Sequence, residues 1–76
     1  MVSLSRGGKV YFQRIRDLRE DADKTQIEIA AMLNMQRSVY RRYELGEREI
    51  PVWAVIKLAY YYKTSTDYIL GQTNKR

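Results

Sequence analysis

The chain contains neither cysteine nor histidine among its 76 residues, and it has a single proline. Without cysteine the fold has no disulfides and does not need an oxidising compartment. Without either residue type, the usual ligands of a structural zinc ion are missing. Histidine is also the usual general base near neutral pH, and no nucleophile–base constellation is visible. We therefore expect no enzymatic activity, no metal and no other cofactor.

Long apolar runs are also missing. No segment approaches the roughly 20 apolar residues of a membrane span, and the N-terminus lacks the apolar core of a secretory signal. We find no internal repeat, coiled-coil heptad or strand alternation in the sequence. Hydrophobic residues nevertheless make up 45% of the chain, so we expect it to fold as one domain with a thin core. A membrane partner is not expected.

The charge of the chain is basic and unevenly distributed. A formal net charge of +5 suits a nucleic acid, an acidic membrane surface or an acidic protein as partner. Acidic residues cluster before position 25 and arginines cluster after position 36, which would orient the domain on a polyanion. The two clusters are Asp17, Glu20, Asp21 and Asp23, then Arg37, Arg41, Arg42 and Arg48.

Residues 25–46, TQIEIAAMLNMQRSVYRRYELG, carry the clearest pattern. Thr25 suits a helix N-cap, because its hydroxyl can accept a hydrogen bond from an N–H of the first turn. Ile29, Ala30 and Leu33 recur at helical spacing and give this helix a buried stripe. Asn34 tolerates the left-handed backbone that ends a helix and turns the chain. We therefore predict a short helix followed by a tight turn.

A second helix is predicted over 36–44 and is stopped by Gly46. Tyr40 and Tyr43, three residues apart, form its buried side. Two helices joined by a tight turn, the second with a basic face, are typical of a helix-turn-helix DNA reader. On periodicity alone, an equally good alternative is a basic helical hairpin with a purely structural role. The exposed basic and polar residues are Arg37, Ser38, Arg41 and Arg42.

The start of the chain is predicted to hold one more helix. Residues 1–9 have no period and are read as a flexible arm. A helix over 10–22 follows, with Ile15, Leu18 and either Tyr11 or Phe12 in its buried stripe. The folded domain is predicted to span 10–71.

Two helices and a tail are predicted after the central pair. Pro51 fits the first turn of a helix, where its missing N–H costs nothing. Ser65 is a good N-cap for a short last helix over 64–70. Residues 72–76 are read as a polar tail. The predicted buried face of the fourth helix consists of Val52, Val55, Ile56, Ala59 and Tyr62.

Three apolar residues stand where the first central helix should face water. They are Ile27, Ala31 and Met32. Scattered surface hydrophobes are normal in soluble proteins, and this is the favoured interpretation. A small contact patch for a partner is the alternative.

The sequence resembles the Xre/Cro-like helix-turn-helix family, which includes many phage repressors. Each matching segment is common alone, but five in the family's order and spacing are specific. The segments are RIRDLRE at 14–20, TQIEIA at 25–30, RSVYRRYELGEREIP at 37–51, IKLAYYY at 56–62 and STDYILGQT at 65–73. The resemblance implies an all-α, five-helix lambda-repressor-like domain, with its second and third helices forming the helix-turn-helix.

The resemblance also implies residue roles. Gln26 matches a glutamine that contacts a DNA phosphate. Arg19 and Glu44 match an arginine–glutamate pair that ties the first helix to the third. The chain departs from the family at two positions. Asn34 replaces the usual turn glycine, and Lys63 replaces the usual glycine or asparagine after the fourth helix. The implied DNA-binding residues are Gln26, Gln36, Arg37, Ser38, Arg41, Arg42 and Arg48.

From the residues and the resemblance together, we expect a sequence-specific transcriptional regulator, a repressor by analogy. A short recognition helix reads few base pairs, so two copies on a short palindromic operator are expected. The expected location is the bacterial cytoplasm, on the nucleoid, in a chain encoded by a bacterium or phage. No small-molecule ligand is expected. The alternative is a protein-interaction module, such as an antitoxin or bridging factor.

Overall fold

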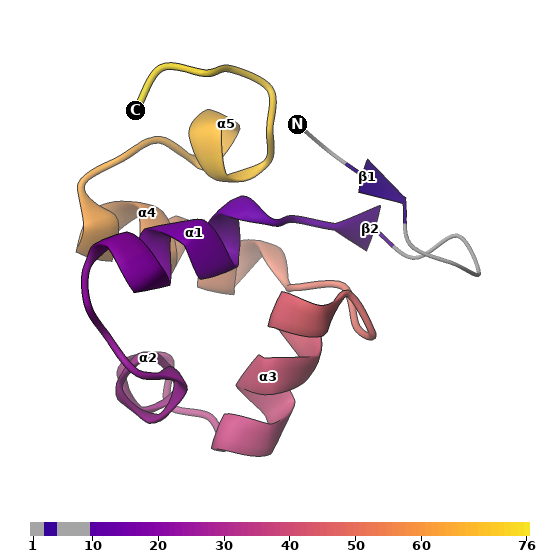
Figure 1. The fold of residues 1–76 in the computed structure, drawn as a ribbon, viewed down its shortest axis with the longest axis vertical. Coiled ribbons are helices and arrows are strands. Elements are labelled where there is room, and N and C mark those ends of the chain that lie inside the picture. The colour runs from indigo at the N-terminus through magenta and orange to yellow at the C-terminus, as the bar shows by residue number, and fades with distance from the viewer. Residues whose placement is uncertain (1–2, 5–9) are drawn as a thin grey trace.

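The computed structural model describes residues 3–4 and 10–76, which form five helices and a small antiparallel ribbon (Figure 1). The predicted all-α, five-helix architecture is confirmed. None of the helices in this part of the chain is long and apolar enough to cross a bilayer. The elements are β1 (Ser3–Leu4), β2 (Val10–Tyr11), α1 (Arg14–Asp21), α2 (Gln26–Met32), α3 (Arg37–Leu45), α4 (Val52–Tyr62) and α5 (Thr66–Ile69).

The first helix begins later than predicted. Val10 and Tyr11 form β2, which pairs antiparallel with β1, so that Val10 lies opposite Leu4. A β-branched residue followed by an aromatic one favours an extended backbone, and the helix starts only at Arg14. The prediction that 10–22 is wholly helical is therefore wrong at its start. The predicted arm at 1–9 lies outside the described residues, apart from the two residues of β1.

The predicted helix boundaries in the central stretch are confirmed by backbone geometry. Thr25 caps α2 by accepting from the Glu28 backbone N–H, and the Glu28 carboxylate accepts from the Thr25 N–H at 3.2 Å. Asn34 turns the chain after α2 with φ 57°. Gly46 stops α3 with φ 74°, a left-handed conformation in which glycine carries no steric cost. Lys63 adopts φ 56° after α4, so the departure from the family preserves the same backbone turn.

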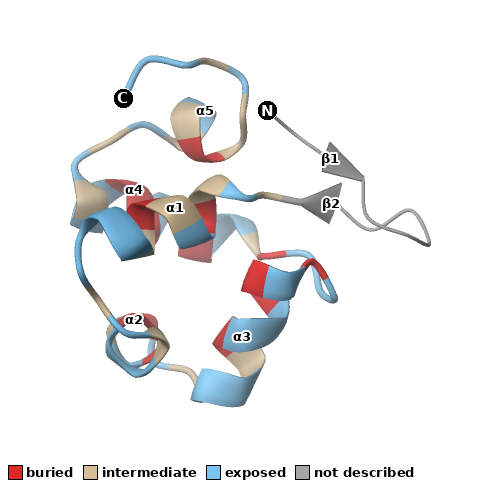
Figure 2. Ribbon diagram, viewed as in Figure 1, coloured by how far each residue is buried: buried red, intermediate tan, exposed pale blue. Residues whose placement is uncertain are grey.

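The core lies where the helices face one another (Figure 2). Ile15 and Leu18, together with the residues predicted to be buried on the second and third helices, are buried, whereas Phe12 is only partly buried. Met35 is partly buried and packs on this cluster from the turn between α2 and α3. The cluster comprises Ile15, Leu18, Ile29, Ala30, Leu33, Tyr40, Tyr43, Ile50, Ala54, Val55, Leu58, Ala59 and Ile69.

The fourth helix faces the core through only part of the predicted set: Val55 and Ala59 are buried as predicted. Val52 is 75% exposed and Ile56 is 43% exposed, so both were wrongly assigned to the buried face. Ala54 and Leu58 are buried instead, alongside Val55. In VWAVIKLAYYY almost every position is apolar, so several stripes satisfy helical periodicity equally. Packing against the neighbouring helices selects one of them.

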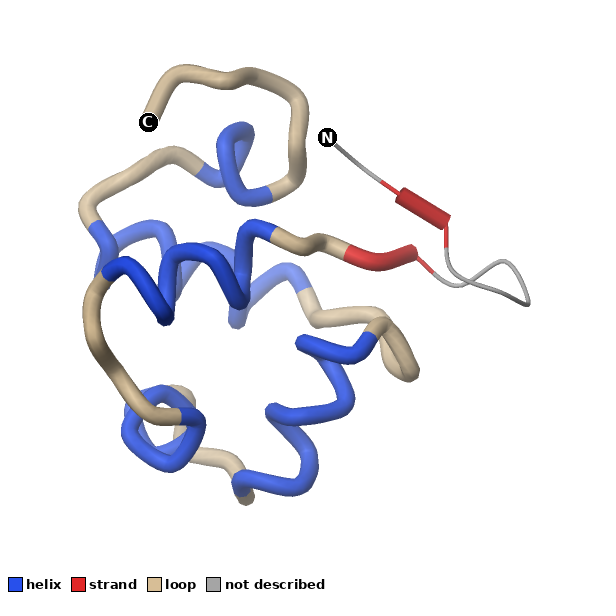
Figure 3. The backbone as a smooth tube through the Cα atoms, in the orientation of Figure 1, coloured by secondary structure: helices blue, strands red, loops and turns tan. Residues whose placement is uncertain are grey.

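The C-terminal tail folds back over α5 and returns toward the end of α1 (Figure 3). The Arg14 guanidinium on α1 donates to the backbone oxygens of Tyr68 and Thr73. Its central carbon also lies 4.1 Å from the centre of the Tyr68 ring, within cation–π range. At the end of the chain, Arg76 pairs with Asp21 at 3.4 Å. The tail is polar, as predicted, and it is also fastened to the domain.

Candidate nucleic-acid interface

Helices α2 and α3 lie together at one end of the molecule, joined by a short turn (Figure 1). The turn combines the left-handed Asn34 with an extended Gln36, whose φ and ψ are −73° and 148°. Gln36 precedes α3 as its N-cap, yet its side chain makes no capping hydrogen bond. Its exposed amide therefore lies at the N-terminal end of α3, next to Arg37 and Ser38. This is the geometry of a helix-turn-helix.

The outer face of α3 carries the polar and basic residues, as the sequence predicted. Tyr40, Tyr43 and Glu44 face inward and are buried. Positions one helical turn apart on the opposite side stay in solvent, which creates a continuous basic surface. The exposed residues on this surface are Arg37, Ser38, Arg41 and Arg42, and Arg48 is exposed in the following loop.

The four arginines of this surface have no polar side-chain partner in the described part of the chain. Within residues 3–4 and 10–76, no ion pair or side-chain hydrogen bond involves Arg37, Arg41, Arg42 or Arg48. A guanidinium offers five N–H donors in a planar fork and stays protonated at any physiological pH. The surface therefore offers free cationic donors on α3 and in the loop after it, suited to phosphate oxygens or to the guanine edge.

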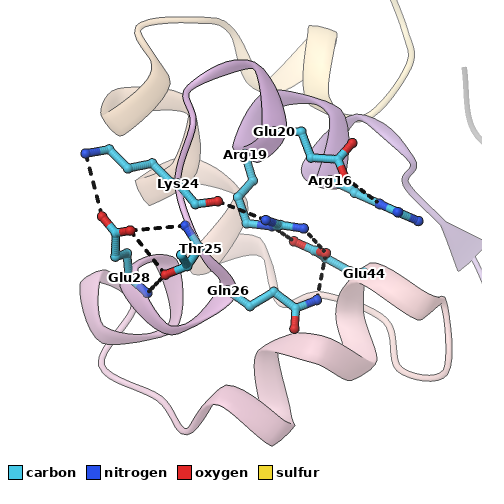
Figure 4. Close-up of polar contacts among 8 residues, drawn as sticks. All are labelled: Arg16, Arg19, Glu20, Lys24, Thr25, Gln26, Glu28 and Glu44. Atoms are coloured by element: carbon cyan, nitrogen blue, oxygen red, sulfur yellow. Dashed lines mark hydrogen bonds and ion pairs between the residues drawn. The ribbon is translucent and has the colours of Figure 1, made fainter.

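Gln26, the other predicted phosphate contact, lies at the first position of α2 and is half-buried. Its side-chain Nε2 donates to the Glu44 Oε1 at 3.0 Å, across to α3 (Figure 4). A carboxylate only accepts, so this bond fixes which end of the amide faces Glu44. The second N–H of the amide and its carbonyl oxygen remain available. No local sequence pattern predicts this link, because the two residues are 18 positions apart.

Glu44 also receives the predicted ion pair from α1. The Arg19 Nε and Nη2 atoms lie 2.6 and 3.1 Å from the two Glu44 oxygens, a bidentate contact. A further Arg19 N–H donates to the Lys24 backbone oxygen at 2.9 Å, just before α2. The Glu44 side chain is 3% exposed and that of Arg19 is 13% exposed. One carboxylate thus joins α1, the start of α2 and the end of α3 (Figure 4).

The protonation states of this network follow from its contacts. Burial opposes ionisation of Glu44, but the hydrogen bonds from Arg19 and Gln26 outweigh it, and the pKa of Glu44 is lowered. The hydrogen bond to Glu44 raises the pKa of Arg19, so the pair is fully charged at neutral pH. Burial, followed by the nearby Glu44 carboxylate, raises the pKa of Tyr40. The Tyr40 hydroxyl is enclosed without a well-formed hydrogen bond within the described residues.

We expect acid to weaken the fold through Glu44. Because its pKa is lower in the folded state than its ordinary value of 4.5, the unfolded chain binds more protons as the pH falls. This contribution is complete above pH 4.5 and is lost as the pH drops through the lowered folded-state pKa. Urea titrations at several pH values between 7 and 3 would measure the loss. Glu44→Gln should show a shallower decline than the wild type, and an equal decline would contradict this assignment.

The possible apolar patch on α2 has fewer exposed residues than the three expected from the sequence. Met32 is only partly exposed and packs against the core cluster. Ile27 is 63% exposed, and Ala31 is exposed beside it. Ile27 and Ala31 are therefore scattered surface hydrophobes, which is the interpretation that the sequence favours.

The fold and this surface together define a helix-turn-helix domain. A family model described as helix-turn-helix (HTH_3) matches residues 15–69. The chain belongs to this family, and the resemblance drawn from its sequence is confirmed.

Named relatives agree with that membership. The chain is 35% identical over 65 residues to the uncharacterized HTH-type transcriptional regulator YobD of Bacillus subtilis (strain 168), covering 86% of this chain and 58% of YobD. It is 35% identical over 60 residues to the HTH-type transcriptional regulator ImmR of the same strain, covering 79% of this chain and 47% of ImmR. This chain thus spans about half the length of these curated relatives.

A solved structure shares the fold. The crystal structure of a transcriptional regulator from Listeria innocua superposes with a TM-score of 0.73 at 26% sequence identity. The match covers 82% of this chain and 58% of the Listeria chain.

Proposed function

We propose that this protein is a sequence-specific DNA-binding transcriptional regulator that reads the major groove with α3. The observation that carries the proposal is the row of exposed, uncommitted arginines on the outer face of α3. An α-helix fits the major groove, and an arginine there can bond bidentately to guanine O6 and N7. The regulator names of its relatives support the same reading, and they agree with the expectation that the chain is not an enzyme.

The contacts divide into base reading and backbone positioning. Arg37, in the first turn of α3, is the leading base reader, followed by Arg41, while Gln36 and Ser38 meet base edges or flanking phosphates. Gln26 holds a phosphate with the free N–H of its amide, at the N-terminus of α2. Its orientation by Glu44 favours this role, because a pre-positioned amide loses little freedom on binding. Arg42 and Arg48 supply further contacts at the same surface.

Two copies on a short palindrome complete the proposed binding mode. A nine-residue recognition helix reaches only a few base pairs, and a second copy on a symmetric half-site supplies the remaining specificity. By analogy with phage repressors we assign repression as the outcome. The proposed location is the bacterial cytoplasm, on the nucleoid.

The division of labour on this surface is testable with two substitutions. Arg37→Ala should cost about 1–3 kcal/mol on the preferred site and flatten the preference at one base pair per half-site. Gln26→Ala should weaken binding to all sequences alike, because phosphate contacts carry no sequence information. Both variants would be compared with the wild type on a library of DNA sites at one salt concentration. If Arg37→Ala weakened every site equally, Arg37 would be a phosphate clamp and base reading would shift to Ser38 or Arg41.

The alternative function is a protein-interaction module, such as an antitoxin or bridging factor. It relies on the exposed Ile27 and Ala31, since Met32 packs inward. A genome-wide binding experiment separates the two functions. A regulator should protect a short palindrome, whereas an interaction module should co-purify with a second protein at fixed ratio and protect no site.

A further inference from the structure

The outer face of α4 carries a row of exposed apolar side chains that the proposed DNA contacts do not use. Val52, Ile56 and Tyr60 are spaced four residues apart and are 75%, 43% and 82% exposed. Residues at this spacing lie above one another on a helix surface. We call these three residues the α4 stripe.

A groove runs beside the α4 stripe, and its other side is formed mainly by the first residue of α5 and by residues flanking that helix. It consists of two hollows, of about 260 and 540 Å³, that share Ile56 and Thr66. The first hollow lies at the beginning of α4 and includes Val52, and the second lies at its end and includes Tyr60. Helix α5 lies at the opposite end of the molecule from α2 and α3 (Figure 1), whereas the first hollow begins at Glu49, the residue after Arg48.

The charges at the two ends of the groove are opposite. Glu49 lines the first hollow and Lys63 lines the second, seven residues before and seven residues after Ile56. Within residues 3–4 and 10–76, neither side chain takes part in an ion pair. An apolar centre with a carboxylate at one end and an ammonium at the other is self-complementary when a second copy is turned by 180°.

From this arrangement we propose that the α4 stripe is the contact surface for a second copy of the chain. The two α4 helices lie antiparallel about a twofold axis at Ile56, so that Glu49 of each copy faces Lys63 of the other. Such an isologous contact uses the same patch on both copies, as closed dimers do. This inference rests on the proposed function in one respect, because it supplies the contact surface of the proposed dimer.

The size of the surface sets the strength of the contact. Helix α4 has 11 residues, which gives a length of about 16 Å. One helix face of this length lies at the small end of specific interfaces, so the dimer should be weak without DNA. We expect a dissociation constant in the micromolar range or above, with symmetric DNA adding to the stability of the pair.

The first test uses sedimentation equilibrium of the full chain without DNA, at concentrations up to the millimolar range. Ile56→Glu places two carboxylates together at the twofold axis and should weaken dimerisation by roughly 100-fold or more. Ile27→Glu is the matched control, because Ile27 is an exposed isoleucine on α2, outside the stripe. It should leave the dimer unchanged. Circular dichroism would verify that both variants remain folded.

A charge exchange tests the antiparallel arrangement. Glu49→Lys should weaken the dimer by roughly tenfold, because like charges then face each other. Adding Lys63→Glu in the same chain should restore it, since each copy again offers opposite charges. Glu20→Lys on α1 has the same charge change outside the stripe and should have no effect. A double variant no stronger than Glu49→Lys would overturn the antiparallel arrangement.

Two outcomes would overturn the proposed surface as a whole. One is a wild-type chain that stays monomeric at every concentration. The other is a dimer that Ile27→Glu disrupts and Ile56→Glu does not, which would move the contact to α2. Fluorescence anisotropy on a single half-site would separately measure DNA binding, and Ile56→Glu should bind it like the wild type. A chain that dimerises through the stripe but binds no DNA would support this inference and contradict the proposed function.

Discussion

Glu44→Ala is expected to lower the free energy of unfolding by about 3–5 kcal/mol, because it leaves the Arg19 guanidinium largely buried and without its partner. The Glu44 carboxylate also accepts from Gln26, so one truncation removes three hydrogen bonds between helices. Small domains have only about 5–15 kcal/mol of total stability. The variant should therefore lose much of its stability and melt at a much lower temperature, as measured by circular dichroism and urea titration.

Glu20→Ala is the matched control for this substitution. Glu20 also pairs with an arginine, Arg16, at 3.2 Å, but both side chains are more than half exposed. Exposed pairs contribute little, so this change should fall within about 0.5 kcal/mol of the wild type. If Glu44→Ala proved equally mild, the buried network would not hold the three helices together as the geometry indicates.

DNA binding is expected to fall steeply with salt concentration. If Arg42 and Arg48 each neutralise one phosphate while Arg37 and Arg41 contact bases, the slope of log K against log salt is roughly −1.8 per copy. Between 50 and 200 mM salt, affinity should then drop by about 12-fold for one copy, and by roughly 150-fold for two copies on one operator. Fluorescence anisotropy over a salt series would measure the slope. Binding that stayed flat over this range would contradict the proposed function.

Single arginine substitutions refine that result. Arg42→Gln should reduce the magnitude of the slope by about one per copy, because one phosphate contact is lost. Arg16→Gln on α1 removes the same charge from a residue that already pairs with Glu20, and it should leave the slope unchanged. A slope that changed equally in both variants would indicate a response to net charge rather than to contacts on α3.

The features that depend on neighbouring residues could be predicted from the sequence. Thr25 and Ser65 each cap a helix, and Asn34 and Gly46 end helices in the left-handed conformation, as expected from their side chains. These effects act within one or two helical turns, so a local reading of the sequence captures them. The same holds for α3, where alternating tyrosines and arginines leave only one side that can be buried.

The features that depend on distant residues are set by packing in the folded domain. The start of α1 was mispredicted because β2 pairs with β1, and strand pairing is a property of two segments. The buried face of α4 was mispredicted because a nearly continuous apolar helix has several equivalent stripes, and contacts with other helices choose among them. The Gln26–Glu44 bond joins residues 18 positions apart, so it exists only after the turn has brought α2 against α3.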